Sequence, residues 1–374
     1  MVKKARLVLE DGTVFQGELF GSETNIAGEV VFNTGMVGYP ESLTDPSYRG
    51  QILVLTYPLV GNYGVPAVTK DELGLPLGFE SERIQIAGLI VSEHAARYSH
   101  YTAVKSLGEW LREHNVPGIS EVDTRAITKR LREHGTMLGK IELSGQETGF
   151  VDPNVKDLVS EVSPRQITEI TGLGGDSPSS PTVVVVDCGC KTNILRSLLL
   201  RGLNVVRVPH DYYFLDIDFD GVLISNGPGD PKMCPETVRN IEHAIAVGKP
   251  ILGICLGHQL LSLAVGAETY KLRFGHRSQN QPCLEQTSDK RVLARERSTA
   301  VITSQNHGYA VREAGMPQDW QIWFKNANDG TVEGIRHISK PFFGVQFHPE
   351  ATPGPVDTAW IFDEFASLVR ERIR

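Results

Sequence analysis

The sequence is poor in the features that mark a disulfide-bonded, zinc-binding or membrane-spanning protein. Only five of its 374 residues are cysteine, an odd number, and all five lie in the second half without a paired C-x-x-C spacing. Neither a disulfide framework nor a cysteine-based zinc site is therefore expected, and a reducing compartment suits the free thiols. No apolar run approaches the ~18 residues that a transmembrane helix needs, so no membrane partner is expected.

Basic charge is also scarce. The chain has 37 Lys and Arg residues against 45 Asp and Glu residues, a net charge of −8, which argues against nucleic acid as the main partner. The basic stretch Lys129–Arg132 has Glu133 beside it and is predicted to be a solvated helix face. Residues 1–4 run straight into a strand-like segment without a signal or transit pattern, so a cytoplasmic location is expected.

Nucleotide-binding motifs are missing as well. The chain contains no Walker loop and no glycine-rich nucleotide motif. We therefore expect no cofactor and no metal in this chain.

The sequence predicts an α/β protein, and a change in composition along the chain divides it into two domains. Residues 1–150 mix an Asp-Gly hairpin over 7–15, strand-like runs and two helical patterns, at 103–114 and 124–134, and read as an α+β domain. Residues 151–181 read as a linker because their end is rich in Gly, Ser and Pro. Over 182–374, strands alternate with helices, which predicts a doubly wound, mainly parallel sheet.

Cys255 lies in the most informative segment of the chain. An apolar run over 250–254 predicts a buried strand, and 260–265 predicts the following helix. Cys255 falls on the sharp turn between them, with a glycine two residues before and two after, which is the cysteine form of a nucleophile elbow. The turn by itself leaves open that Cys255 is a buried structural residue.

A second apolar strand, over 341–347, ends in His348-Pro349-Glu350. Catalytic groups gather at the carboxyl ends of strands in parallel α/β sheets, so His348 and Cys255 can meet there. Glu350 can return past the proline turn to orient the imidazole. The pattern predicts a Cys-His-Glu triad of nucleophile, base and orienting group. On its own, the second segment also fits a surface turn.

The combination of motifs resembles the class I, or triad, glutamine amidotransferases, and over nearly the whole chain it is similar to carbamoyl-phosphate synthetase small subunits and to the glutaminase region of fused pyrimidine-pathway enzymes. The segments that carry the resemblance are 253–259, 348–350, the Ser-Asn-Gly-Pro-Gly-Asp-Pro loop at 225–231, 28–41, 43–48 and 304–309.

The resemblance implies a set of site residues. The backbone amides of Leu256 and Gly227 would hold the oxyanion of the reaction. The α-amino and α-carboxylate groups of glutamine would meet Ser47, Gly229, Gln259, Asn306, Gly308 and Tyr309. Ser47 comes from the first half, so the resemblance places the site where the two domains meet. His258 and His307 are predicted to have structural roles.

The resemblance further implies hydrolysis of L-glutamine to glutamate and ammonia through a cysteinyl thioester. The ammonia would pass to a carbamoyl-phosphate synthetase large subunit or domain, which uses ATP and magnesium, for arginine or pyrimidine biosynthesis. The first half would be the docking module. Three alternatives stay open at this point: another triad amidotransferase, a γ-glutamyl hydrolase, and a regulatory docking subunit without catalysis. The sequence leaves open whether the chain is a free subunit or part of a fused enzyme.

Overall fold

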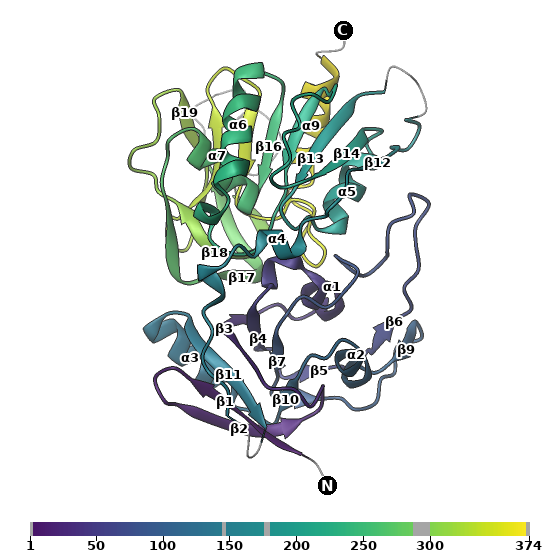
Figure 1. Ribbon diagram of the computed structural model, residues 1–374, viewed down its shortest axis with the longest axis vertical. Coiled ribbons are helices and arrows are strands. Elements are labelled where there is room, and N and C mark those ends of the chain that lie inside the picture. The colour runs from purple at the N-terminus through teal and green to yellow at the C-terminus, as the bar shows by residue number, and fades with distance from the viewer. Residues whose placement is uncertain (1–2, 144–146, 176–179, 287–299, 372–374) are drawn as a thin grey trace. The chain divides into compact units, whose positions relative to one another are not determined.

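The computed structural model describes residues 3–143, 147–175, 180–286 and 300–371, which form two compact units (Figure 1). The first unit comprises Met1–Leu158 with Arg273–Arg277, and the second comprises Val159–Leu272 with Ser278–Arg374. Within the segment predicted as a linker, α4 (Val159–Val162) and β12 (Thr168–Ile170) belong to the second unit. The division into 1–150, 151–181 and 182–374 stays a prediction.

A closed barrel of seven strands forms the first unit, with the strand order β1-β11-β3-β4-β7-β10-β2. The hairpin predicted over 7–15 is present as the antiparallel pair β1–β2, and Gly12 takes a positive φ of 84° at its turn. β3, β4, β7 and β10 pair in parallel. The strands are β1 (Lys4–Leu9), β2 (Val14–Leu19), β3 (Ile26–Asn33), β4 (Gln51–Leu55), β7 (Gly88–Ile90), β10 (Gly118–Ser120) and β11 (Met137–Leu143).

Three helices and several short elements complete this unit. The helices are α1 (Tyr39–Thr44), α2 (Leu107–Glu113) and α3 (Thr124–His134), and the short elements are η1 (Pro46–Tyr48), β5 (Leu59–Val60), β6 (Val65–Pro66), β8 (Glu93–His94), β9 (Ala103–Lys105) and η2 (Pro153–Val155). The predicted helix at 103–114 is wrong in its first residues, which form β9. Ser106 and Glu109 make a capping box, which sets the start of α2 four residues later.

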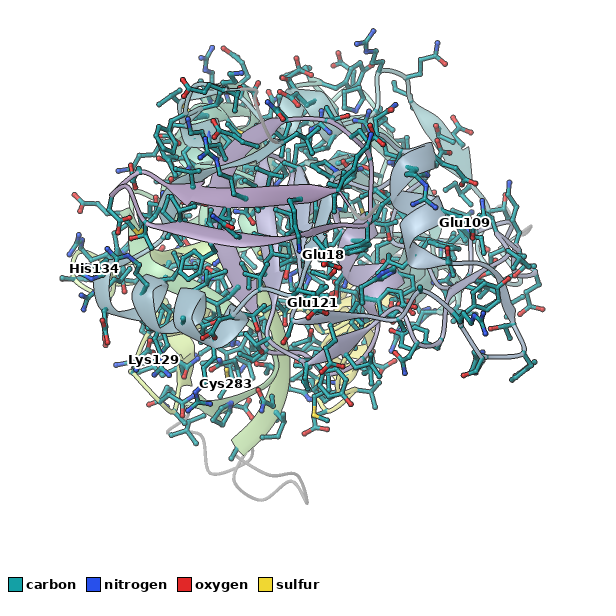
Figure 2. The ribbon with its side chains drawn as sticks, turned by 90° about the horizontal axis from the view of Figure 1, so that it is seen from below. Glu18, Glu109, Glu121, Lys129, His134 and Cys283 are labelled. Atoms are coloured by element: carbon teal, nitrogen blue, oxygen red, sulfur yellow. The ribbon has the colours of Figure 1, made fainter. Side chains whose placement is uncertain are left out.

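The helix α3 has the bounds that the sequence predicts. Its buried residues include Ile127 and Leu131, which face the barrel core. Lys129 and His134 lie on its exposed side (Figure 2). The basic stretch is therefore a solvated helix face, as predicted.

The second unit is built on a ten-stranded sheet with the order β12-β14-β13-β15-β16-β21-β20-β18-β17-β19. Five neighbouring strands of this sheet, β14-β13-β15-β16-β21, run parallel, which confirms the predicted α/β fold. They are β13 (Thr182–Asp187), β14 (Asn204–Pro209), β15 (Gly221–Ile224), β16 (Ile251–Ile254) and β21 (Phe342–Val345). The others are β17 (Thr269–Glu285), β18 (Ala300–Val311), β19 (Trp320–Asn326) and β20 (Val332–His337).

Helices pack on this sheet in two pairs (Figure 1). α6 (Pro235–Val247) packs on α7 (Leu256–Ala264), and α5 (Thr192–Leu199) packs on α9 (Trp360–Glu371). The core contains Val184, Ile224 and Leu260. The last helix, α9, begins at Trp360, and residues 356–359 before it form a turn in which the Ala359 amide donates to the Val356 carbonyl. In the described chain, no helix has the length and apolar character that a membrane span requires.

Candidate active site

The register of the parallel strands brings four loops to one edge of the sheet. Val186 pairs with Ile224, Ile224 with Gly253, and Ile254 with Val345. The residues that follow these positions therefore leave neighbouring strands at the same level. This is the edge at which ligands bind in open α/β sheets, and it places Cys255 and His348 on adjacent strand ends.

Cys255 occupies a strained elbow between β16 and α7. Its backbone has φ 54° and ψ −104°, a conformation that an L-residue rarely adopts and that costs about 1–3 kcal/mol. The Cys255 amide donates to the carbonyl of Val345 at 2.8 Å, which ties the elbow to β21. The Sγ atom lies 3.7 Å from the carbonyl oxygen of Asn306. Cys255 is thus held at the position that the sequence predicts for a nucleophile.

Two glycines make this elbow possible. A Cβ on Gly257 would lie 2.0 Å from the carbonyl oxygen of Ile224, and one on Gly253 would lie 2.6 Å from that of Gly257. The loop over residues 225–229, which we call the oxyanion loop after its predicted role, is equally tight, because a Cβ on Gly227 would lie 2.1 Å from the carbonyl oxygen of Cys188. Close backbone approach explains why glycine stands at these positions.

His348 and Glu350 form a buried pair at the end of β21. The His348 Nδ1 and Glu350 Oε1 atoms are 2.6 Å apart. Burial opposes a charged imidazole, but the Glu350 carboxylate and the Cys255 thiol outweigh it and raise the pKa of His348 to about 10. The Nε2 atom makes no hydrogen bond with another described group. Glu350 therefore occupies the Nδ1 side of the ring and leaves Nε2 for chemistry.

Lys191 is a member of the site that sequence reasoning missed. Its buried Nζ atom lies 3.0 Å from Glu350 Oε1 and donates to the carbonyl of Ala351 at 2.6 Å. Burial alone would raise the pKa of Glu350, but the charges of Lys191 and His348 lower it to about 2. Asn193 also donates to the carbonyl of Glu350. The only sequence signal was a lysine just after a predicted strand, which is normally a solvated residue.

The other predicted residues of the second unit lie on the elements around the elbow. Gln259, on α7, donates through Nε2 to the carbonyl of Tyr309 at 2.8 Å and to Gln346 Oε1 at 3.0 Å. Asn306, Gly308 and Tyr309 lie on β18, and Leu256 is the first residue of α7. Gly229 has a φ of 85° in the oxyanion loop. Gln346, which accepts from Gln259, and Asn226, whose Oδ1 accepts from the Lys191 amide at 3.0 Å, make contacts that the sequence did not reveal.

The two additional histidines are both buried. His258 is fully buried, which lowers its pKa to about 3 and keeps it neutral. A Cβ on Gly344 would lie 3.1 Å from the His258 Nδ1 atom, so the ring fills the space beside β21. His307 bonds through Nδ1 to the carbonyl of Tyr309 at 2.8 Å and through Nε2 to Gln305 Oε1 at 2.9 Å. These contacts agree with structural roles.

Ser47 belongs to the first unit. It lies in η1, and its amide donates to Asp45 Oδ1 at 2.9 Å, as in other turns capped by aspartate. Its approach to the residues around Cys255 stays a prediction.

Comparison with known proteins matches each unit to a described family. Residues 184–368 match the class-I glutamine amidotransferase model. Residues 7–141 match the model of the carbamoyl-phosphate synthase small chain, CPSase domain. The class is therefore that of triad amidotransferases joined to a small-chain domain.

Several curated relatives are similar over almost the whole chain. The carbamoyl phosphate synthase arginine-specific small chain of Neurospora crassa is 49% identical over 98% of this chain and 80% of its own length. The multifunctional protein pyrABCN of Emericella nidulans is 50% identical over 98% of this chain, which spans 17% of that protein. The human mitochondrial carbamoyl-phosphate synthase [ammonia] is 47% identical, and this chain spans 24% of it. The chain belongs to the carbamoyl-phosphate synthase small-chain family.

Proposed function

We propose that this chain hydrolyses L-glutamine and delivers the ammonia to a carbamoyl-phosphate synthetase large subunit or domain. The observation that carries the proposal is the alignment of Cys255, His348 and Glu350 on adjacent strand ends, in a chain of the small-chain family. A cysteine with a hydrogen-bonded His-Glu pair is a nucleophile with its base and its orienting group.

In the proposed reaction, the Cys255 thiolate attacks the side-chain carbonyl carbon of glutamine. The amides of Leu256 and Gly227 stabilise the oxyanion, and one such donor is typically worth about 3 kcal/mol. The C–N bond then breaks, His348 protonates the departing ammonia, and a glutamyl thioester remains. His348 next removes a proton from water, which attacks the thioester and releases glutamate. Glu350 holds the imidazolium that forms in each half of the reaction.

Glutamine binding completes the proposed assignment. The α-amino and α-carboxylate groups of the bound glutamine would contact Gly229, Gln259 and the β18 residues Asn306, Gly308 and Tyr309. Ser47 of the first unit would add a further contact. The hydrogen bonds of Gln259 with Tyr309 and Gln346 support this assignment, because they hold α7 and β18 together beside the elbow.

The partner follows from the fate of ammonia. Ammonia is mostly protonated at neutral pH, so a productive glutaminase needs an acceptor enzyme in contact with it. We assign the ATP- and magnesium-dependent steps to that partner and the docking role to the first unit, and we place the complex in arginine or pyrimidine biosynthesis. A cytoplasmic location remains our expectation, since the five free thiols suit a reducing compartment.

The test is steady-state glutamate release by the chain alone, with a synthetase large subunit, and with that subunit plus ATP and bicarbonate. We expect slow hydrolysis by the chain alone and faster hydrolysis in the complex, because about 1 Å of misalignment in a site can cost roughly a hundredfold in rate. Equal turnover in all three conditions would favour a self-sufficient γ-glutamyl hydrolase. Acceleration of glutamate release by a different acceptor enzyme would indicate another triad amidotransferase. No glutamate release in any condition would indicate a regulatory subunit.

A further inference from the structure

The turn 187–191, at the end of β13, contacts both the His348–Glu350 pair and the oxyanion loop. Asp187, which is fully buried, accepts hydrogen bonds through Oδ1 from the amides of Gly189 and Cys190, each at 2.8 Å. Its Oδ2 atom pairs with the guanidinium of Arg207. Gly189 takes a φ of 117°, which a glycine adopts without strain. The turn therefore has a fixed shape that ends in Lys191.

On one side, the turn reaches the His348–Glu350 pair. Lys191 projects its ammonium group to Glu350 Oε1 and to the carbonyl of Ala351. Because the same Glu350 oxygen contacts His348 Nδ1, the position of Lys191 sets the position of the carboxylate that orients the base.

On its other side, the turn grips the oxyanion loop. The Lys191 amide donates to Asn226 Oδ1 at 3.0 Å. The Cys188 amide donates to Ser225 Oγ at 2.9 Å, and Ser225 Oγ donates to the carbonyl of Asn226 at 2.8 Å. Asn226 is fully buried. The turn thus holds the Asn226 side chain directly and the Asn226 carbonyl through Ser225, and the next amide is that of Gly227.

We propose that Asn226 is a positioning residue that couples the oxyanion loop to the His348–Glu350 pair through Lys191. A displacement of the peptide between Asn226 and Gly227 is transmitted to Lys191, because the Asn226 side chain bonds to the Lys191 amide. The displacement then reaches Glu350 and His348. The proposal rests on the glutaminase function of this site and adds that the oxyanion donor and the base are aligned by one shared element.

A double-mutant cycle of Asn226→Ala and Lys191→Met tests the coupling. We expect Asn226→Ala to lower glutamine turnover at least tenfold, and Asn226→Asp, which keeps an acceptor oxygen for the Lys191 amide, to recover to within about threefold of wild type. In the Lys191→Met background, the loss from Asn226→Ala should shrink at least threefold, because coupled residues are not additive. Losses that simply multiply would overturn the proposal.

A second readout separates positioning from stability and from a role in the oxyanion loop alone. Alkylation of Cys255 by iodoacetamide needs the activated thiol but no oxyanion hole, with Cys255→Ser as the blank for the other cysteines. We expect Asn226→Ala to slow this alkylation severalfold while Asn226→Asp restores it. Unchanged alkylation beside a large loss of turnover would confine Asn226 to the oxyanion loop and reject the coupling. If Asn226→Ala does not fold, the same cycle with Asn226→Ser, which also removes the Oδ1 acceptor of the Lys191 amide, decides additivity. A wild-type chain that alkylates normally but releases no glutamate would instead reject the glutaminase function.

Discussion

Two histidines, one half-buried in the first unit and one buried in the second, are driven to opposite charge states by their surroundings. His94 of the first unit stacks on Phe20 with ring centroids 4.0 Å apart, and burial together with the Arg112 charge lowers its pKa to about 4. His348 of the second unit is buried more deeply, yet Glu350 and Cys255 raise its pKa to about 10. Burial alone favours the neutral form of a histidine, whereas an acidic neighbour keeps the imidazole protonated. We therefore place the proposed chemistry in the second unit, whereas His94 of the first unit packs on Phe20.

The largest expected effect comes from removing the nucleophile in the second unit. Cys255→Ser should reduce glutamine hydrolysis by at least about a thousandfold, because a hydroxyl is far less nucleophilic than a thiolate at neutral pH. The complex with a synthetase large subunit should still use added ammonium salts, since docking does not need the thiol. Glutamate release and ammonium-dependent carbamoyl phosphate formation are the two measurements. Glutaminase activity within tenfold of wild type would remove Cys255 from its role.

Substitution of the base and substitution of its orienting group should differ sharply in their effect on turnover. His348→Asn should lower turnover at least about a hundredfold more than Glu350→Gln, because the imidazole performs both proton transfers and the carboxylate only orients it. Turnover of the two variants at saturating glutamine provides the comparison, and a worse lesion from Glu350→Gln would reverse the two roles.

Lys191 should have an intermediate effect. Lys191→Met leaves Glu350 without its cationic partner, and we expect turnover to fall between tenfold and about a hundredfold, as for a site misaligned by ~1 Å. The exposed Lys340 provides the matched control, and Lys340→Met should keep wild-type turnover. If the two lysine variants behave alike in glutamate release, Lys191 does not position the pair.

Ser47 brings the comparison back to the first unit. Ser47→Ala should raise the Michaelis constant for glutamine about fivefold to tenfold, with little change in turnover, because a lost ground-state hydrogen bond weakens uniform binding. Ser99→Ala, an exposed serine of the same unit, is the control. An unchanged Michaelis constant in the Ser47 variant would mean that the first unit does not contribute to glutamine binding.

The smallest effect is on stability and depends on pH. The raised pKa of His348 stabilises the fold fully below its ordinary value of 6.5, and this contribution is lost as the pH rises toward about 10. The lowered pKa of Glu350 acts in the opposite sense, and its contribution is lost as the pH falls from 4.5 toward about 2. The melting temperature of wild type should therefore exceed that of His348→Asn most between these windows and least at alkaline pH. A constant difference across the range would argue against a charged His348.

The sequence was sufficient for the parts of the molecule that depend on local pattern. The elbow at Cys255 was predicted because its two glycines are neighbours in sequence, and the pairing of β16 with β21 brought His348 beside it as the strand-end rule requires. α3 was placed correctly by its periodicity. The segment 103–105 was misassigned because its alternation is too short to separate a strand from the first turn of a helix, and the Ser106 cap decides it.

Other features depend on contacts that no local pattern records. The closure of the first barrel joins β1 to β11 and β2 to β10, which are far apart in the chain. Lys191 and Glu350 are likewise remote in sequence, and only the common level of β13 and β21 in the sheet brings them to 3.0 Å. A lysine in a loop is usually solvated, so its burial beside a carboxylate could be found only in three dimensions.

The position of β21 in the chain also matters during synthesis. A ribosome releases the elbow at Cys255 well before it makes β21, the strand that supplies His348 and Glu350 and that inserts between β16 and β20. Until that strand is in place, the Val345 carbonyl that anchors the elbow is missing and the cysteine has no base. If the proposed mechanism holds, we expect a chain that ends before β21 to be inert toward glutamine, because its sheet lacks both the base and the anchor of the elbow.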